Sequence, residues 1–291
     1  MQRNKLKSLI HFHFIVFIFG FTAILGSLIS VDSIELVWYR MLIASICLII
    51  LAPFLNKNLN ISRSLVLKLF FCGVIISLHW VFFFKAIKLS NVSITLSILS
   101  LGAFITSFLE PILYKRKIIF YEVVLGFLVV VGTAIIFKTQ FHYLEGILYA
   151  LGSVVLSVFF TLFNGKLIGK TSSFTISLYE LLGGFVTISI LLIITNDFNR
   201  DLFLLEKDDF IWLFVLGTIC TAYAFVISVE VMKHLTPYSV MLSINMEPVY
   251  GIVLAIVFLN ESENMSYEFY IGFLLIFISV ILNAILKLKQ K

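Results

Sequence analysis

A glutamate and an arginine lie inside long apolar stretches of this sequence, where a charged side chain is costly. Glu247 falls in the run 237–259, and Arg40 falls in the run 34–55. An ionisable residue at the centre of a membrane-spanning helix costs about 2.5–3.5 kcal/mol on insertion scales. Such groups can bind an amino or carboxylate group, carry a proton, or pair with each other. These two residues are therefore the first candidates for function.

Glu247 is the eleventh residue of its run, which at about 1.5 Å per residue places it about 15 Å deep, at the middle of a bilayer. Ser239, Ser243, Glu247 and Tyr250 are spaced i, i+4, i+8 and i+11, which predicts that they share one helix face. We expect Glu247 to bind an amino group or to carry a proton. The alternative is a carboxylate satisfied by neighbouring side chains or by the backbone freed at Pro248.

Arg40 is the seventh residue of its run, about 9–10 Å below the membrane edge. Its depth differs from that of Glu247 by about 6 Å, which long side chains can bridge. We expect Arg40 to pair with Glu247 in one state or to bind a substrate carboxylate; charge-reversal swaps that restore nothing would count against pairing. The alternative is an arginine that snorkels to the headgroups. Glu180, at the mirrored depth of the run 174–195, is too far away for a simple pair with Arg40.

Seven further residues are predicted to line a substrate site together with Glu247 and Arg40. They are His79, Trp80, Ser97, Tyr223, Ser243, Asn245 and Tyr250. Structural alternatives exist: a tryptophan near the end of a span often belongs to the interfacial belt, a lone histidine is often only hydrogen-bonded, and serines permit close helix packing in lipid. No catalytic residue, metal site or cofactor is predicted, because the sequence lacks the zinc-protease, serine-hydrolase and phosphate-loop motifs.

Composition sets the environment in which these residues act. The chain is 61% hydrophobic and 13% charged, with a mean hydropathy of +1.10, whereas soluble domains are about 45–50% apolar and about 25% charged. Spans of about 20 apolar residues cross a bilayer as helices, because lipid offers backbone groups no other partner. The sequence therefore predicts an all-α integral membrane protein with ten transmembrane helices. The predicted spans are 9–29, 34–55, 64–86, 91–113, 119–137, 144–165, 174–195, 209–231, 237–259 and 268–287.

The basic residues indicate which way the chain crosses the membrane. The connections on the side of the N-terminus hold 15 Lys and Arg residues, and those on the other side hold 5. By the positive-inside rule both termini are cytoplasmic, which places the chain in a bacterial cytoplasmic membrane as a multi-pass protein. The net charge of +5 is thereby explained, and no nucleic-acid partner is implied.

The sequence repeats itself at an interval close to half its length. "YEVVLGFL" at 121–128 returns as "YEFYIGFL" at 267–274, 146 residues later. Each half holds five predicted spans, an odd number, so the second half must be inverted relative to the first. We therefore expect two inverted five-helix repeats, 1–140 and 141–291. Leu101 occupies the position of Glu247 in the first repeat, so the carboxylate is present in one half only, which favours a functional role. Secondary transporters with inverted repeats rock around a midplane site.

These features resemble the EamA-type members of the drug/metabolite transporter superfamily. The resemblance is carried by "WYRMLIA" (38–44), "FKAIKLSNVS" (84–93), "VMKHLTPYSV" (231–240), Pro248 and "NE" (260–261), and by the glycines Gly126 and Gly272. Gly102 departs from the family pattern, which often has proline there, and Lys115 stands where an acidic residue is common. The resemblance covers essentially the whole chain and implies ten helices, cytoplasmic termini, and transport of small metabolites, often amino acids and often outward.

The leading hypothesis is a secondary transporter that moves a small, amino-acid-like metabolite by alternating access. Nucleobases and drug-like amines are alternative substrates, and a channel-like or structural membrane protein is the main rival class. A membrane-embedded enzyme ranks third, because the catalytic motifs are missing. The expected partners are the lipid bilayer and a small-molecule substrate, with coupling to a proton or ion gradient and a monomeric or homodimeric state.

Overall fold

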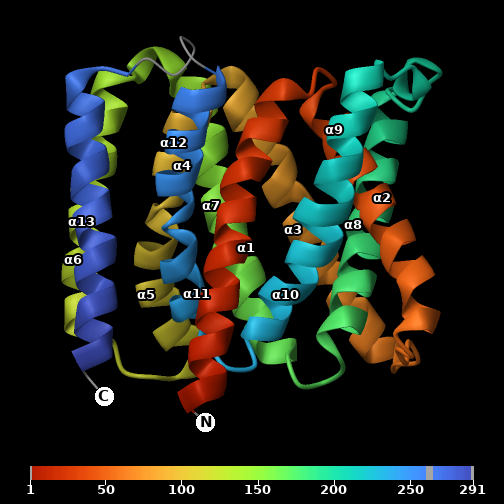
Figure 1. The fold of residues 1–291 in the computed structure, drawn as a ribbon, viewed down its shortest axis with the longest axis horizontal. Helices are drawn as coiled ribbons and strands as arrows, with labels where there is room; N and C mark the ends of the chain where they lie inside the picture. Colours follow the sequence, from red (N-terminus) through yellow and green to blue (C-terminus); the bar gives the residue numbers. More distant parts are fainter. Residues whose placement is uncertain (1, 260–264, 290–291) are drawn as a thin grey trace.

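The protein is a bundle of long helices that stand side by side (Figure 1). The computed structural model describes residues 2–259 and 265–289, and every regular element in these ranges is a helix. The first half comprises α1 (Gln2–Leu28), α2 (Ser33–Phe54), α3 (Arg63–Leu89), α4 (Val92–Leu99), α5 (Leu101–Tyr114) and α6 (Phe120–Thr139). The second half comprises η1 (Phe141–Tyr143), α7 (Leu144–Leu167), α8 (Ser173–Thr195), η2 (Asp201–Phe203), α9 (Lys207–Gly217), η3 (Thr218–Tyr223), α10 (Ala224–Val231), α11 (Pro237–Ile244), α12 (Glu247–Leu259) and α13 (Tyr267–Lys289).

These elements form the ten predicted spans. Within the described residues, nine helical stretches are long and apolar enough to cross a bilayer, and α13 adds the apolar segment Tyr267–Leu282. Three spans consist of several elements in series: α4 with α5, α9 with η3 and α10, and α11 with α12. The prediction of an all-α integral membrane protein is confirmed. The "NE" pair at 260–261 lies outside the described residues.

Helix starts follow the capping residues that the sequence offers. Five helices begin after a residue whose side chain accepts a hydrogen bond from a backbone N–H of the first turn, which satisfies one of the free donors there. These residues are Asp32 for α2, Ser62 for α3, Asn91 for α4, Ser172 for α8 and Thr236 for α11. All five stand at the edges of predicted spans, where the backbone leaves the bilayer and meets water.

The helix contacts are those of two inverted repeats. The first span of each half packs on the fourth span of the other half. Thus α1, the first span, contacts α12 in the ninth, and α7, the sixth span, contacts α5 in the fourth. The third span of each half packs on the first and second spans of the other: α3 contacts α7 and α8, whereas the α9–η3–α10 span contacts α1 and α2. The fifth spans, α6 and α13, pack on each other at one end of the bundle (Figure 1). The helix α1 begins and α13 ends at the same face (Figure 1).

The fourth span of each half is broken at the same register. The helix α4 ends at Leu99 and α5 begins at Leu101, whereas α11 ends at Ile244 and α12 begins at Glu247. Pro248, the second residue of α12, has no N–H, and its ring would clash with the carbonyl four residues earlier, so the helix stops before it. Gly102 stands 146 residues before Pro248, at the matching position.

This break corrects one prediction. Ser239, Ser243, Glu247 and Tyr250 were expected on one face of a continuous helix, but the two turn residues Asn245 and Met246 separate the serines from Glu247 and Tyr250. The spacing rule requires unbroken α-helical geometry, which Pro248 prevents. The stripe of four side chains therefore divides between two short helices.

The close approach of α3 and α8 depends on a glycine. A Cβ atom placed on Gly73 would lie 2.3 Å from the carbonyl oxygen of Glu180 and 2.8 Å from the backbone nitrogen of Gly184. Small residues at helix contacts let backbones approach in lipid, where packing rather than hydrophobicity holds helices together. The two halves are joined at this contact, so Gly73 is a structural requirement of the fold.

We predict that Gly73→Ala lowers the free energy of unfolding by about 1–3 kcal/mol, because backbone atoms of α8 cannot move aside without separating the helices. Thermal unfolding in detergent measures the loss. Gly152→Ala is the matched control, since its Cβ would meet only the side chain of Phe82, at 2.7 Å, and that ring can shift. Equal losses in the two variants would contradict the role assigned to Gly73.

Candidate functional site

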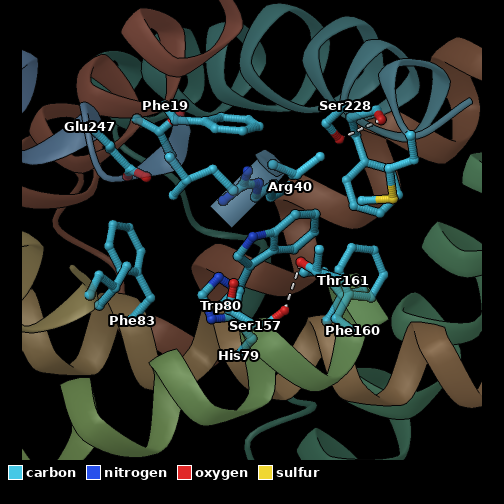
Figure 2. Close-up of a pocket in the computed structure, with 17 residues that line it drawn as sticks. Phe19, Arg40, His79, Trp80, Phe83, Ser157, Phe160, Thr161, Ser228 and Glu247 are labelled. Atoms are coloured by element: carbon cyan, nitrogen blue, oxygen red, sulfur yellow. Dashed lines mark hydrogen bonds between the residues drawn. The ribbon is translucent and has the colours of Figure 1, made fainter. Parts of the chain in front are cut away.

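A cavity of about 90 Å³ lies between the two halves of the bundle. Its walls come from both halves: α1 to α4 supply one part, and α7, α10, α11 and α12 supply the other. Figure 2 shows Arg40 among the residues that line it, with Glu247 to one side, and the lining includes Met232 and Val240. Met232 directly follows α10 and Val240 is in the first turn of α11, so the cavity extends from mid-depth toward the face at which the chain termini lie.

Arg40 turns inward and is held by an irregular turn. Only 2% of the residue is exposed, so it does not snorkel to the headgroups. Its Nε donates to Oγ1 of Thr221 at 2.7 Å, and its Nη2 lies 3.5 Å from the carbonyl oxygen of Cys220. Both partners belong to η3, a π-helical turn in which the Thr221 hydroxyl donates to the carbonyl of Leu216, five residues earlier. Single π-helical turns within α-helices often mark functional sites.

The guanidinium of Arg40 also lies over an aromatic ring. Its central carbon is 3.8 Å from the ring centroid of Trp80, a geometry in which the ring face attracts the cation (Figure 2). Its Nη1 is buried and has no hydrogen-bond partner among the described residues. A charged donor without a partner in a buried site is expensive. An anionic group that entered the cavity would therefore find a positive charge already in place.

Glu247 faces the same cavity from the other half. It is the first residue of α12, is 7% exposed, and accepts no hydrogen bond from the part of the chain that the structure describes. Its place in the first helical turn is favourable for a negative charge, because the helix dipole is positive there. The carboxyl group therefore lines the cavity with no hydrogen bond found among the described residues, and its role in binding stays a prediction.

Arg40 and Glu247 do not form the ion pair that we considered from their depths. Their charged atoms are not within salt-bridge distance of each other, although both lie among the described residues. Instead, the Glu247 carboxylate points toward the space in front of the Arg40 guanidinium (Figure 2). The cavity thus presents a guanidinium and a carboxyl side chain that are not in direct contact with each other.

His79 and Trp80 both line the cavity, on α3. The Nδ1 of His79 lies 2.8 Å from the hydroxyl oxygen and 2.9 Å from the carbonyl oxygen of Ser153, which fixes the ring against α7. Trp80 is 7% exposed and packs edge to face with Phe225, with ring centroids 5.6 Å apart. The indole is therefore an inner wall of the cavity and not part of an interfacial belt.

Ser97 and Ser243 are buried, but neither lines the cavity. The hydroxyl of Ser97 donates to the carbonyl of Ser93 at 2.7 Å, and that of Ser243 donates to the carbonyl of Ser239 at 3.0 Å. Serines inside helices commonly make such bonds to the preceding turn. In this structure the two residues act in helix packing, and their role in binding stays a prediction.

Tyr223, Asn245 and Tyr250 also lie away from the cavity. Tyr223 is 42% exposed, and its hydroxyl is 2.7 Å from Nε2 of His11. Asn245 lines a separate cavity of about 10 Å³, and Tyr250 packs edge to face on Phe17 with centroids 5.6 Å apart. The structure therefore brings together four of the nine predicted residues: Arg40, His79, Trp80 and Glu247.

Several cavity residues were not predicted from the sequence. Phe160 and Phe225 stack with centroids 5.5 Å apart and close one side, while Ser157, Thr161 and Ser228 supply hydroxyl groups (Figure 2). Ser157 and Thr161 have an i, i+4 spacing that was visible in the sequence. The spacing alone, however, does not say whether that face meets a cavity or another helix.

Known proteins are similar to this chain in sequence and in fold. The profile of the EamA-like transporter family matches residues 7–138 and 144–285. The uncharacterized transporter YxxF of Bacillus subtilis (strain 168) is 25% identical over 292 residues, which span 98% of this chain and 91% of that protein. A solved crystal structure that is 16% identical has the same fold, with a TM-score of 0.72 over 96% of this chain and 98% of the other. The chain belongs to the EamA-like transporter family.

Proposed function

We propose that this membrane transporter carries a small zwitterionic, amino-acid-like metabolite across the bacterial cytoplasmic membrane by alternating access. The observation that carries the proposal is that Arg40 and Glu247, a basic and an acidic side chain, line one cavity without forming an ion pair, and that Nη1 of Arg40 has no partner among the described residues. The Arg40 guanidinium would bind the substrate carboxylate, and Glu247 would bind its ammonium group. Each bound group would satisfy a buried charge that the protein leaves without a full set of partners.

The walls of the cavity support a substrate with a modest apolar part. Trp80, Phe83, Phe160 and Phe225 surround the charged groups, and a volume of about 90 Å³ admits only a small molecule. Ligand sites typically combine such apolar walls with a few placed polar groups. A drug-like amine is the second candidate, because Glu247 and the aromatic rings suffice to bind a cation without any help from Arg40.

The arrangement of the halves supports alternating access. We propose that the repeats 1–140 and 141–291 rock against each other around the cavity, which lies at the interface between them. At the end opposite the termini, Lys88 donates to the carbonyls of Ile29 at 2.9 Å and Val31 at 2.6 Å, and Asp209 accepts from the backbone and hydroxyl groups of Ser30. These contacts hold the connection between α1 and α2 against α3 and α9. They would have to break if the transporter opened at the end of the bundle opposite the termini.

The first prediction from this proposed function concerns transport itself. In proteoliposomes, unlabelled amino acid inside the vesicles should accelerate uptake of the labelled compound, and Glu247→Gln should abolish this counterflow because it removes the charge that binds the ammonium group. The exposed Glu268→Gln is the matched control and should transport normally. Uptake without acceleration by internal substrate would indicate a channel-like pathway, and full counterflow in Glu247→Gln would contradict the assigned site.

The second prediction separates a zwitterion from an amine. An amino acid should compete for counterflow at least tenfold better than its decarboxylated amine, since loss of the carboxylate forfeits a charged hydrogen bond to Arg40, worth about 1.5–3 kcal/mol. Arg40→Lys should reduce this preference, because an ammonium group cannot reproduce the planar guanidinium over Trp80. Equal competition by acid and amine, with no effect of Arg40→Lys, would favour the amine carrier.

The third prediction tests orientation. With Cys47, Cys72 and Cys220 replaced by serine, a cysteine at Asn199, in the exposed connection between α8 and α9, should react with a membrane-impermeant maleimide in intact cells. A cysteine at Asn58, between α2 and α3, should react only after the cells are permeabilised, since its side of the bundle carries most of the basic residues. The reverse labelling pattern would overturn the proposed cytoplasmic termini.

A further inference from the structure

A second, larger cleft opens at the face where the termini lie, between α3 and α7. It has a volume of about 630 Å³ and is separate from the central cavity, with which it shares no lining residue. The residues around it are of two kinds: Ser64, Lys68, Lys166 and Lys170 are polar or charged, whereas Leu67, Phe71, Phe163 and Leu167 are apolar. Cys72 lies at its deep end.

Three positive charges converge on this cleft without an acidic partner. Within the described part of the chain, no carboxylate lies within ion-pair distance of Lys68, Lys166 or Lys170. Two other basic residues near the same face do have acidic partners: Arg116 pairs with Glu110 and Glu122, and Lys233 pairs with Glu230. The ring of Tyr114 lies near one of the three lysines, with its centroid 5.4 Å from Nζ of Lys166. The cleft is therefore prepared for a negative charge from outside the protein.

Two aromatic residues lie deeper in the cleft than its mouth. The helix α3 begins at Arg63 and α7 ends at Leu167, so Ser64 and Lys170 lie at the mouth of the cleft. Phe71 is seven residues further along α3 than Ser64, which corresponds to about 10 Å of helix. Phe163 approaches it from α7, with ring centroids 5.9 Å apart. The cleft thus carries lysines among leucines near its mouth and an aromatic pair toward the membrane interior.

This polarity matches a phospholipid. We propose that the cleft binds one anionic phospholipid, with its phosphate among the three lysines and an acyl chain along Leu67 and Phe71. Basic pockets between transmembrane helices are recognised sites for such headgroups. A soluble anion would use the lysines but would leave the aromatic floor uncovered, and Leu67 and Phe71 are 71% and 56% exposed in the structure. The helices that form the cleft, α3 and α7, belong to opposite repeats, so a lipid seated there would contact both halves.

The test uses the full-length protein in detergent. Titration with dioleoyl phosphatidylglycerol, followed by native mass spectrometry, should show one saturable lipid, whereas phosphatidylcholine with the same chains should not saturate. Replacing Lys68, Lys166 and Lys170 with glutamine should weaken phosphatidylglycerol binding by about a hundredfold. The control replaces Lys57, Lys115 and Lys117 with glutamine; these exposed lysines lie at the same face but outside the cleft, and binding should fall far less.

A second variant separates a lipid from a soluble anion. Phe71→Ala keeps the three lysines and should weaken phosphatidylglycerol binding without changing the binding of glycerol phosphate, which has no acyl chain. If glycerol phosphate binds as tightly as the lipid, the site is one for a soluble anion and the lipid assignment is wrong. If the two triple-glutamine variants lose affinity equally, binding reflects the general positive charge of this face and the cleft is not the site. If no saturable lipid is observed at all, the proposal is overturned.

Discussion

Lipid offers no hydrogen-bond partner at the depth of Arg40 and Glu247, so each polar group there must find a partner within the protein or in a bound molecule. Arg40 meets this requirement through Thr221, Cys220 and the face of Trp80. The π-helical turn that presents Thr221 interrupts an otherwise regular span, and it brings this hydroxyl to the guanidinium. The arginine and the irregular turn therefore depend on each other. The Nη1 of Arg40 has no partner among the described residues, and Arg40 and Glu247 both line the cavity. In the proposed function, the substrate supplies partners for both side chains.

The repeated architecture makes the differences between the halves informative. Arg40 stands seven residues after Ser33, the first residue of α2, and Glu180 stands seven residues after Ser173, the first residue of α8. Opposite charges thus occupy equivalent places in the two repeats. Glu180 is fully buried and accepts from Nδ2 of Asn164 at 3.2 Å, whereas only Arg40 lines the central cavity. The fold is shared by both halves, but the charged groups of the cavity lie where the halves differ.

Much of the fold could be predicted from the sequence because its causes are local. Run length and apolar composition predict spans such as α2 and α8, and the 146-residue repeat predicts their inverted arrangement. Arg40 and Glu247 could be found because a charge in an apolar run stands out. The partners of Arg40 could not, since Thr221 reaches it only through a π-helical turn that no periodicity reveals. Tyr223, two residues further, was predicted to line the substrate site, but it is 42% exposed and lies outside the cavity.

The two charges of the cavity belong to opposite halves, which links binding to movement in the proposed mechanism. Arg40 is carried by the first half and Glu247 by the second, so a substrate that bridges them favours conformations in which the halves hold both groups at the right distance. Arg40 is also bonded to Thr221 of the second half. Rocking of one half against the other must therefore stretch or exchange this bond. A substrate carboxylate is the natural replacement, because it can accept from the same guanidinium while the helices separate. The helix break before Pro248 adds a hinge beside Glu247, where a small rotation of α12 redirects the carboxylate without unfolding a continuous helix.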